Sequence, residues 1–185
     1  MAGAVRLEDA GEADLADDFN LGQVRFTSNS SLGDAGALLL VSSGANVSGV
    51  LGGRFGDLFN FNSAAGVGGA LYETGSPLNL SISSSNFNNN SDAFGLPAIA
   101  NATTGTLTVD NTNIHNNSSG PSPFLSFALG SFGPVDFSNS SIYNNSVGAF
   151  GLLDFAGPIA QSSISNSTIS SNNYDGFAAV YARGP

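Results

Sequence analysis

Residues 80–93 read LSISSSNFNNNSDA, residues 107–120 read LTVDNTNIHNNSSG, and residues 135–148 read VDFSNSSIYNNSVG. The three segments align without a gap, and their starts lie 27 and 28 residues apart (107 − 80 and 135 − 107). In each segment apolar residues occupy the first and third positions, an aromatic residue or isoleucine the eighth, and asparagine the eleventh. A repeat of this length indicates a solenoid, in which one small structural unit recurs along the chain.

The same motif extends in both directions from these segments. An aromatic residue or isoleucine precedes an asparagine by three positions six times, and the asparagines lie 33, 28, 27, 28 and 27 residues apart. The pairs are Phe26/Asn29, Phe59/Asn62, Phe87/Asn90, Ile114/Asn117, Ile142/Asn145 and Ile169/Asn172.

Further columns keep this register. Eight residues before each asparagine stand Leu21, Arg54, Ile82, Val109, Phe137 and Ile164, and eight after stand Ala37, Ala70, Ala98, Leu125, Leu153 and Val180. Each repeat therefore contains three short segments of period two, separated by glycine, proline, asparagine and serine, which is the pattern of strands joined by turns.

The predicted fold is all-β: a right-handed parallel β-helix with three short strands per coil and about six coils. Coils stack at about 4.8 Å, which gives a rod roughly 29 Å long. We expect Asn29, Asn62, Asn90, Asn117, Asn145 and Asn172 to form a structural ladder along one corner, because stacked amides can hydrogen-bond along the axis. A β-sandwich or an irregular linker would not keep both the interval and the apolar columns.

The two ends differ from the middle. Residues 1–20 are expected to form an acidic N-terminal cap, with a short helix over 5–18, and residues 21–185 the parallel β-helix. Solenoids need such caps because an open end presents unpaired strand edges. At the other end, the strand-like run from Ala178 meets no cap, so either a longer solenoid continues or this end docks on another copy.

Composition excludes several classes of protein. Four arginines and no lysine stand against 14 acidic residues, for a net charge of −10, and there is no cysteine. Nucleic-acid binding draws on cationic contacts to phosphate, so DNA and RNA are not expected as partners. Thiolate chemistry and disulfides are absent. No apolar run reaches the roughly 18–20 residues of a membrane span.

The first two coils carry a family resemblance. Residues 26–38 read FTSNSSLGDAGAL and residues 59–71 read FNFNSAAGVGGAL. An FxxN motif followed by GGA and an aliphatic residue resembles the repeats of chlamydial-type polymorphic membrane proteins, which are autotransporter passengers. The resemblance implies a surface-displayed β-helix used in adhesion. Only the second coil has the complete GGA, and the later coils keep the FxxN-like half alone.

Asp110 and Asp136 form the best candidate for catalysis. Both belong to the outward positions of the first strand on neighbouring coils, and a diagonal placement would separate their Cα atoms by about 8 Å. This is in the range of the two carboxyl groups of an inverting glycosidase. Pectin-active β-helices also use basic residues, and here Arg25 and Arg54 lie in earlier coils. Solvated surface acids, or a loose calcium contact, are the alternative.

The other chemical candidates are weaker. His115 is the only histidine and shares a polar column with Thr27, Asn60, Asn88, Tyr143 and Ser170, so a surface role is expected. Asp110 to Asn113 resembles the start of a calcium loop but lacks its later glycine and glutamate. We therefore expect no cofactor and no metal site.

Taken together, the sequence predicts a non-enzymatic structural or adhesive solenoid, extracellular or on the cell surface, or part of an assembly or filament. Its expected partners are other copies or neighbouring subunits, through end-to-end or edge contacts, and possibly glycans. Two alternatives remain open: a carbohydrate-active β-helix that uses Asp110 and Asp136, and an ice-binding solenoid with a flat hydroxyl-bearing face.

Overall fold

The structure is a computed structural model of the 185-residue chain. It describes residues 3–8, 18–42, 47–52, 56–93, 97–101, 105–119, 129–131, 133–147, 151–155, 162–174 and 178–182. Within these ranges all regular structure is β-strand, and every strand pairing is parallel.

The strands form four sheets, here called A to D, in which neighbouring strands are consecutive turns of the chain. Sheet A contains β1 (Val5–Glu8), β5 (Leu38–Ser42), β9 (Leu71–Gly75), β13 (Ile99–Asn101), β17 (Leu129–Ser131), β21 (Gly151–Phe155) and β25 (Ala178–Ala182). Sheet B contains β2 (Asp18–Leu21), β6 (Val47–Leu51), β10 (Leu78–Ser83), β14 (Leu107–Asp110), β18 (Val135–Ser138) and β22 (Ser163–Ser165).

The other two sheets lie on either side of the predicted asparagine corner. Sheet C contains β3 (Arg25–Thr27), β7 (Leu58–Asn60), β11 (Asn86–Asn88), β15 (Asn113–His115), β19 (Ser141–Tyr143) and β23 (Thr168–Ser170). Sheet D contains β4 (Ser30–Ser31), β8 (Ser63–Ala64), β12 (Ser91–Asp92), β16 (Ser118–Ser119), β20 (Ser146–Val147) and β24 (Asn173–Tyr174). The three predicted strands correspond to sheets B, C and A, and sheet D adds a two-residue strand after each asparagine.

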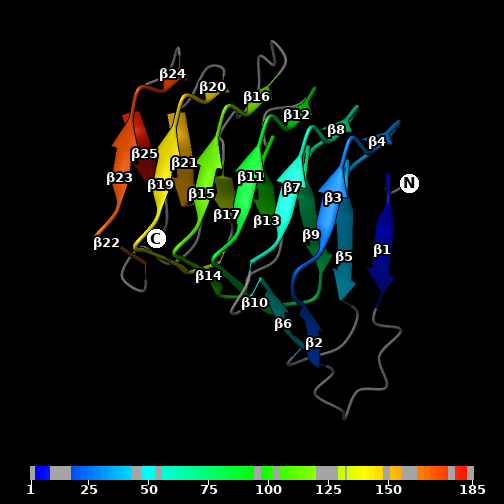
Figure 1. The fold of residues 1–185 in the computed structure, drawn as a ribbon. Coiled ribbons are helices and arrows are strands. Elements are labelled where there is room, and N and C mark those ends of the chain that lie inside the picture. The colour runs from blue at the N-terminus through cyan, green and yellow to red at the C-terminus, as the bar shows by residue number, and fades with distance from the viewer. Residues whose placement is uncertain are drawn as a thin grey trace.

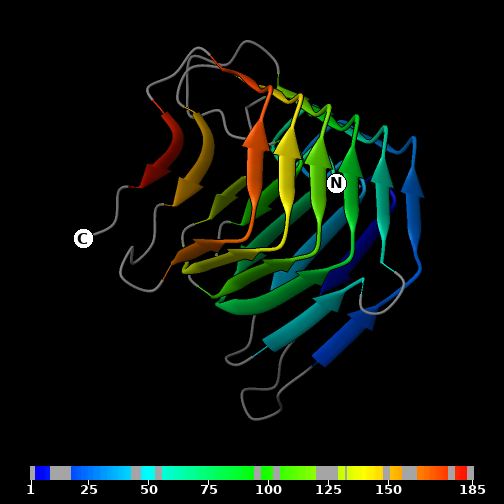
Figure 2. The same cartoon turned by 60° about the vertical axis from the view of Figure 1, so that its left-hand side comes forward.

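The chain thus winds through six coils, each passing through sheets B, C, D and A in turn; coil 1 is β2–β5 and coil 6 is β22–β25, and β1 precedes coil 1. In Figure 1 the strands of sheet C rise at the front, the chain crosses the top, and sheet A descends behind while the coils advance from right to left. This sense of winding is right-handed, as expected for parallel crossovers. Figure 2 shows the coils stacked side by side along the rod.

The predicted Phe/Ile column is confirmed by the register. Phe26, Phe59, Phe87, Ile114, Ile142 and Ile169 are successive strand partners in sheet C. Phe26 and Phe59 stack with ring centroids 4.8 Å apart, and Phe59 and Phe87 at 4.5 Å and 2° between planes. With the aliphatic columns of sheets A and B, these side chains fill the inside of the rod.

Two of the predicted columns are partly wrong. In coil 2, Leu51 and not Arg54 pairs with Leu21 and Ile82 in sheet B. In coil 4, Leu129 and not Leu125 pairs with Leu153 in sheet A. Ala37, Ala70 and Ala98 lie one position before this column, because Leu38, Leu71 and Ile99 are the partners that continue into Leu129, Leu153 and Val180. In coils 2 and 4 extra residues lie between strands, and counting from the asparagine cannot tell at which turn they were inserted.

The helix expected over residues 5–18 is also wrong where it can be assessed. Val5–Glu8 is strand β1, paired with β5, and Asp18 begins strand β2, paired with β6. Val5 and Leu7 pack against the core, because their period of two matches that of β5. The intervening residues of the expected helix, 9–17, lie outside the described residues.

The corners on each side of sheet C use a left-handed residue in every coil. Before the asparagine, φ lies between +53° and +59° at Ser28, Phe61, Asn89, Asn116, Asn144 and Ser171. Before β3 and its equivalents, φ lies between +45° and +69° at Gln23, Gly56, Ser84, Asn111, Asn139 and Asn166. Asparagine and glycine adopt this conformation at the lowest cost, which explains why asparagine recurs before the ladder residues.

Phe61 is the costly member of this column, since an aromatic side chain is poorly suited to φ +55° and here is 57% exposed. We predict that Phe61→Asn raises the free energy of unfolding by about 1 kcal/mol, because left-handed backbone costs an ordinary residue about 1–2 kcal/mol. Thermal unfolding followed by circular dichroism measures the change. Phe61→Ala keeps a Cβ without the local amide and serves as control; an equal gain in both variants would contradict the backbone explanation.

Candidate functional site

The six predicted ladder asparagines lie one above another at the corner between sheets C and D. The Nδ2 group of each donates to the Oδ1 atom of the next, at 2.8 Å from Asn29 to Asn62 and 2.9–3.0 Å along Asn62, Asn90, Asn117, Asn145 and Asn172. The same Oδ1 atoms accept the backbone N–H of the preceding asparagine at 2.9–3.1 Å. The structure therefore brings all six together.

The ladder satisfies groups that the corner would otherwise bury without partners. The second Nδ2 hydrogen reaches the carbonyl of a Phe or Ile one coil earlier, as from Asn90 to Phe59 and from Asn117 to Phe87, both 3.0 Å. Asn62, Asn90 and Asn117 are fully buried. Because buried backbone groups need hydrogen-bond partners, these amides replace strand pairing where the chain turns.

A second ladder, not predicted from the sequence, lies at the corner between sheets B and C. The backbone N–H groups of Ser85, Thr112 and Ser140 donate to the hydroxyls of Thr112, Ser140 and Ser167, respectively, at 3.0–3.3 Å. Each hydroxyl in turn donates to the carbonyl two residues before it in its own coil. The signal was present in the sequence as a Ser/Thr column five positions before the asparagines.

In coil 2 this hydroxyl ladder contains an acid, Asp57. Its backbone N–H donates to Ser85 Oγ at 3.2 Å, and its Oδ1 accepts the N–H of Val24 at 2.8 Å. Asp57 is 3% exposed, and its Oδ2 is buried without a hydrogen-bond partner. Burial raises the pKa of this carboxyl above its ordinary value of 3.8, against the opposing effect of the bonds to backbone.

We predict that Asp57→Asn stabilises the fold at neutral pH by about 1–2 kcal/mol, because the neutral amide can keep the bond from Val24 without the desolvation cost of a buried charge. Since the folded-state pKa of Asp57 is raised, its contribution to stability is greatest below the unfolded-state pKa near 3.8 and is lost as pH rises through the folded-state value. The gain should thus shrink toward pH 3.5. Urea unfolding of both proteins from pH 3.5 to 8 tests this; a pH-independent difference would contradict it.

Asp110 and Asp136 lie on the outer face of sheet B, diagonally on neighbouring coils as predicted, since Asp110 pairs with Ser138 and Asp136 with Thr108. Oxygen Oδ1 of Asp110 accepts from Ser138 Oγ and Asn139 Nδ2, both at 2.7 Å. Ser163 Oγ donates to Asp136 Oδ1 at 2.9 Å. Each carboxylate therefore binds a hydroxyl of the next coil, which is a stabilising role between coils.

The acid pair has little of what glycoside hydrolysis requires. The bonds from Asn139 and Ser138 lower the pKa of Asp110, which suits a general base and not the general acid that must protonate the leaving group. Arg25 lies in coil 1, three coils before Asp110, and Arg54 lies outside the described residues. The described parts of these two coils place no basic side chain beside the pair.

His115 occupies the polar outer column of sheet C expected for it, between Asn88 and Tyr143. Its ring stacks on Tyr143 at 4.6 Å between centroids, its Nε2 lies 3.0 Å from Asn86 Oδ1, and its Nδ1 lies 2.9 Å from Asn116 Nδ2. Asn86 Oδ1 can only accept and Asn116 Nδ2 can only donate, so these partners fit a neutral ring that carries its proton on Nε2. Burial lowers the pKa of His115, so the ring stays neutral at physiological pH.

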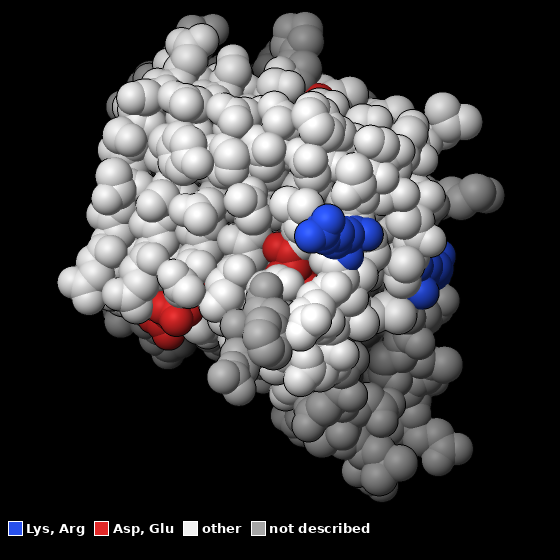
Figure 3. Space-filling view, in the orientation of Figure 1, with Lys and Arg blue, Asp and Glu red and all other residues white. Residues whose placement is uncertain are grey.

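The face built on sheet C is mostly uncharged. Figure 3 shows blue patches only toward the N-terminal coils, a small red patch beside the nearer one, and a second red patch at the lower left, toward the C-terminal coils. Arg25 and Asp57, from adjoining coils, line one cavity at the N-terminal coils. Sequence reasoning missed this pair, although the 33-residue spacing marked coil 2 as irregular.

Among the described residues, no three or more His, Cys, Asp or Glu side chains gather as a metal site would require, and no helix of a length and apolarity able to cross a membrane occurs. Comparison with protein-family models, with curated proteins and with solved structures finds no match to this chain.

Proposed function

We propose that this protein is a non-enzymatic structural or adhesive β-solenoid, displayed outside the cell or built into an extracellular assembly or filament. The outer faces of sheets B and C support this, because their polar side chains bond mainly to one another from coil to coil. Such faces suit a rigid rod that makes many weak polar contacts, including contacts with glycans. The resemblance of residues 26–71 to autotransporter-passenger repeats favours surface display.

The observation that carries the proposal is this coil-to-coil bonding of outer polar side chains. Coil 6 shows which groups an end-to-end contact would cover. Ile164 is 40% exposed, whereas Ile82, Val109 and Phe137, the preceding members of its column, are fully buried. The backbone N–H of Asn172 has no acceptor among the described residues, although every earlier ladder N–H has one. A further coil, whether of a longer chain, another copy or a neighbouring subunit, would cover both.

Coil 1 presents the complementary group. The N–H and Nδ2 of Asn29 point along the ladder to Asn62, and its Oδ1 accepts from no described residue. In a second copy the N–H of Asn172 reaches this oxygen only where β25 takes the place of β1 beside β5. Such a head-to-tail contact is heterologous, and repeated contacts of this kind give an open filament.

The experiment is sedimentation and electron microscopy of the purified chain over a range of concentrations. We expect concentration-dependent association into rods, lost in Ile164→Asp, because the new carboxylate would be buried at the junction. Ser165→Asp adds the same charge to the outward side of the same strand and should associate like the wild type. Monomers at every concentration, or assembly of Ile164→Asp, would refute end-to-end contact.

A further inference from the structure

Several irregular features of the solenoid lie at the B–C corner of coils 1 to 3. From Leu51 to Asp57 the chain takes six residues, whereas from their partners Ile82 to Ser85 it takes three. The extra segment is closed by a hydrogen bond of 3.2 Å from Gly56 N–H to the Gly52 carbonyl. Departures from a local rule in an otherwise regular fold are typical of functional sites.

Both closing glycines are required by the backbone. Gly52 has φ +94° and Gly56 φ +69°, and a Cβ on either would lie within 2 Å of a carbonyl oxygen of coil 3. Gly52 and Gly56, which flank the extra residues, therefore lie closely against coil 3.

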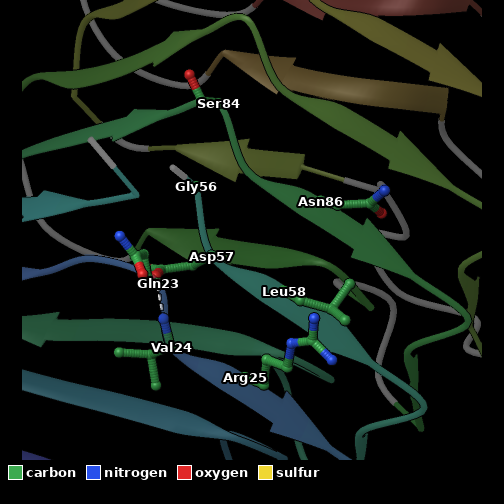
Figure 4. Close-up of a pocket in the computed structure, with 8 residues that line it drawn as sticks. All are labelled: Gln23, Val24, Arg25, Gly56, Asp57, Leu58, Ser84 and Asn86. Carbon is green, nitrogen blue, oxygen red and sulfur yellow. Dashed lines mark hydrogen bonds between the residues drawn. The ribbon is translucent and has the colours of Figure 1, made fainter. Parts of the chain in front are cut away.

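A cavity of about 400 Å³ lies at this corner, within the size range of small-molecule sites. Figure 4 shows its wall: Gln23 and Arg25 from coil 1, Asp57 from coil 2, and Ser84 and Asn86 from coil 3. Three successive coils thus contribute side chains to one hollow on the flank of the rod.

The wall offers mainly hydrogen-bond donors. Asn86 accepts from His115 through Oδ1, which leaves its Nδ2 available, and Ser84 Oγ accepts from Asn111, which leaves its own proton available. Arg25 is exposed and forms no ion pair with any described residue. These groups suit a ligand rich in oxygen acceptors that also carries a negative charge.

Asp57, in contrast, is an acceptor that requires a hydrogen-bond donor from the ligand. Its Oδ2 is enclosed and has no donor, and in Figure 4 the Gln23 side chain lies beside the carboxylate. Gln23 is exposed, so its side chain can turn outward and admit a ligand hydroxyl to Oδ2. A serine or threonine hydroxyl at this position would fit the ladder between sheets B and C better than a carboxylate does. A ligand hydroxyl that donates to Oδ2 would explain why an acid stands there instead.

We propose that this cavity binds an anionic saccharide unit, with its carboxylate on Arg25, its ring hydroxyl oxygens on Asn86 and Ser84, and one hydroxyl donating to Asp57. This site goes beyond the proposed structural role, because it lies on the flank of the rod and needs no second copy.

The test is an NMR titration of the ¹⁵N-labelled chain at pH 7 with glucuronate and, separately, glucose, following the amides of Leu58 and Asn86. Glucuronate should bind about tenfold more tightly than glucose, the worth of a charge-assisted hydrogen bond. Arg25→Gln should remove that preference. Arg6→Gln, which removes the same charge from β1 outside the cavity, should keep it. Asp57→Asn should weaken both sugars by about tenfold while leaving the fold intact.

Equal affinity for the two sugars, or a preference that survives Arg25→Gln, would overturn the assignment of an anionic ligand. Absence of shifts at these amides with either sugar, in protein whose spectrum is that of the folded chain, would overturn the site itself. Neither result depends on end-to-end association, so the assembly proposal stands or falls separately.

Discussion

Replacing Asn117 by alanine is expected to lower the free energy of unfolding by about 3–6 kcal/mol, the largest effect of any single change considered for this chain. Asn117 Oδ1 accepts the backbone N–H and Nδ2 of Asn90, and its Nδ2 donates to Phe87 and Asn145. Alanine leaves these groups buried without partners. Each orphaned group costs about 1–3 kcal/mol.

Urea unfolding measures the Asn117→Ala change, and Asn113→Ala provides the matched control four residues earlier. Asn113 is exposed on β15, and its side chain forms no hydrogen bond with a described residue. Its removal should alter stability by less than about 0.5 kcal/mol. Similar losses in the two variants would show that the ladder contributes no more than an ordinary surface amide.

Replacing Phe59 by alanine is expected to cost about 3–5 kcal/mol, as for other buried aromatic residues. Phe59 is fully buried in the middle of the stack, with Phe26 on one side and Phe87 on the other. A void at this place removes contacts in three coils. In a solenoid each coil is stabilised by its neighbours, so the N-terminal coils should lose protection first.

The comparison variant for Phe59 is isoleucine, which occupies the same column at Ile114 and Ile142. Phe59→Ile should cost only about 1–2 kcal/mol, because a branched aliphatic side chain still fills much of the space. Phe61→Ala, two residues along but exposed, is the control for loss of a phenyl ring. Hydrogen exchange of the β3 and β7 amides locates the loss; protection unchanged in these strands would contradict local coupling between coils.

Much of the fold followed from the sequence because the asparagine corner is its most regular feature. Asn90, Asn117 and Asn145 fix both the spacing and the register, since a slip of one residue would turn every side chain to the other face. Inserted residues limit this reasoning. The interval of 33 between Asn29 and Asn62 gives the number of extra residues but does not show at which turn of the coil they are inserted. Leu51 rather than Arg54 therefore took the inward place.

The candidate site was less predictable for the same reason. Asp110 and Asp136 are conspicuous as acids on a polar strand, yet their oxygens are occupied by Ser138 and Ser163. Asp57 stands five residues before Asn62, where the later coils have Ser or Thr, but its burial also depends on where the extra residues of coil 2 lie. Its position became evident only when the ladder from Ser85 to Ser167 was traced through space.

The asparagine ladder has a direction, and this makes the rod electrically polar. Every side-chain carbonyl from Asn62 to Asn172 faces the coil before it. The aligned amides, each with a dipole similar to the roughly 3.5 D of a peptide unit, add along the axis. The rod should therefore orient in an applied field, which transient electric birefringence would detect, with coil 6 toward the negative electrode as far as the ladder alone determines the dipole.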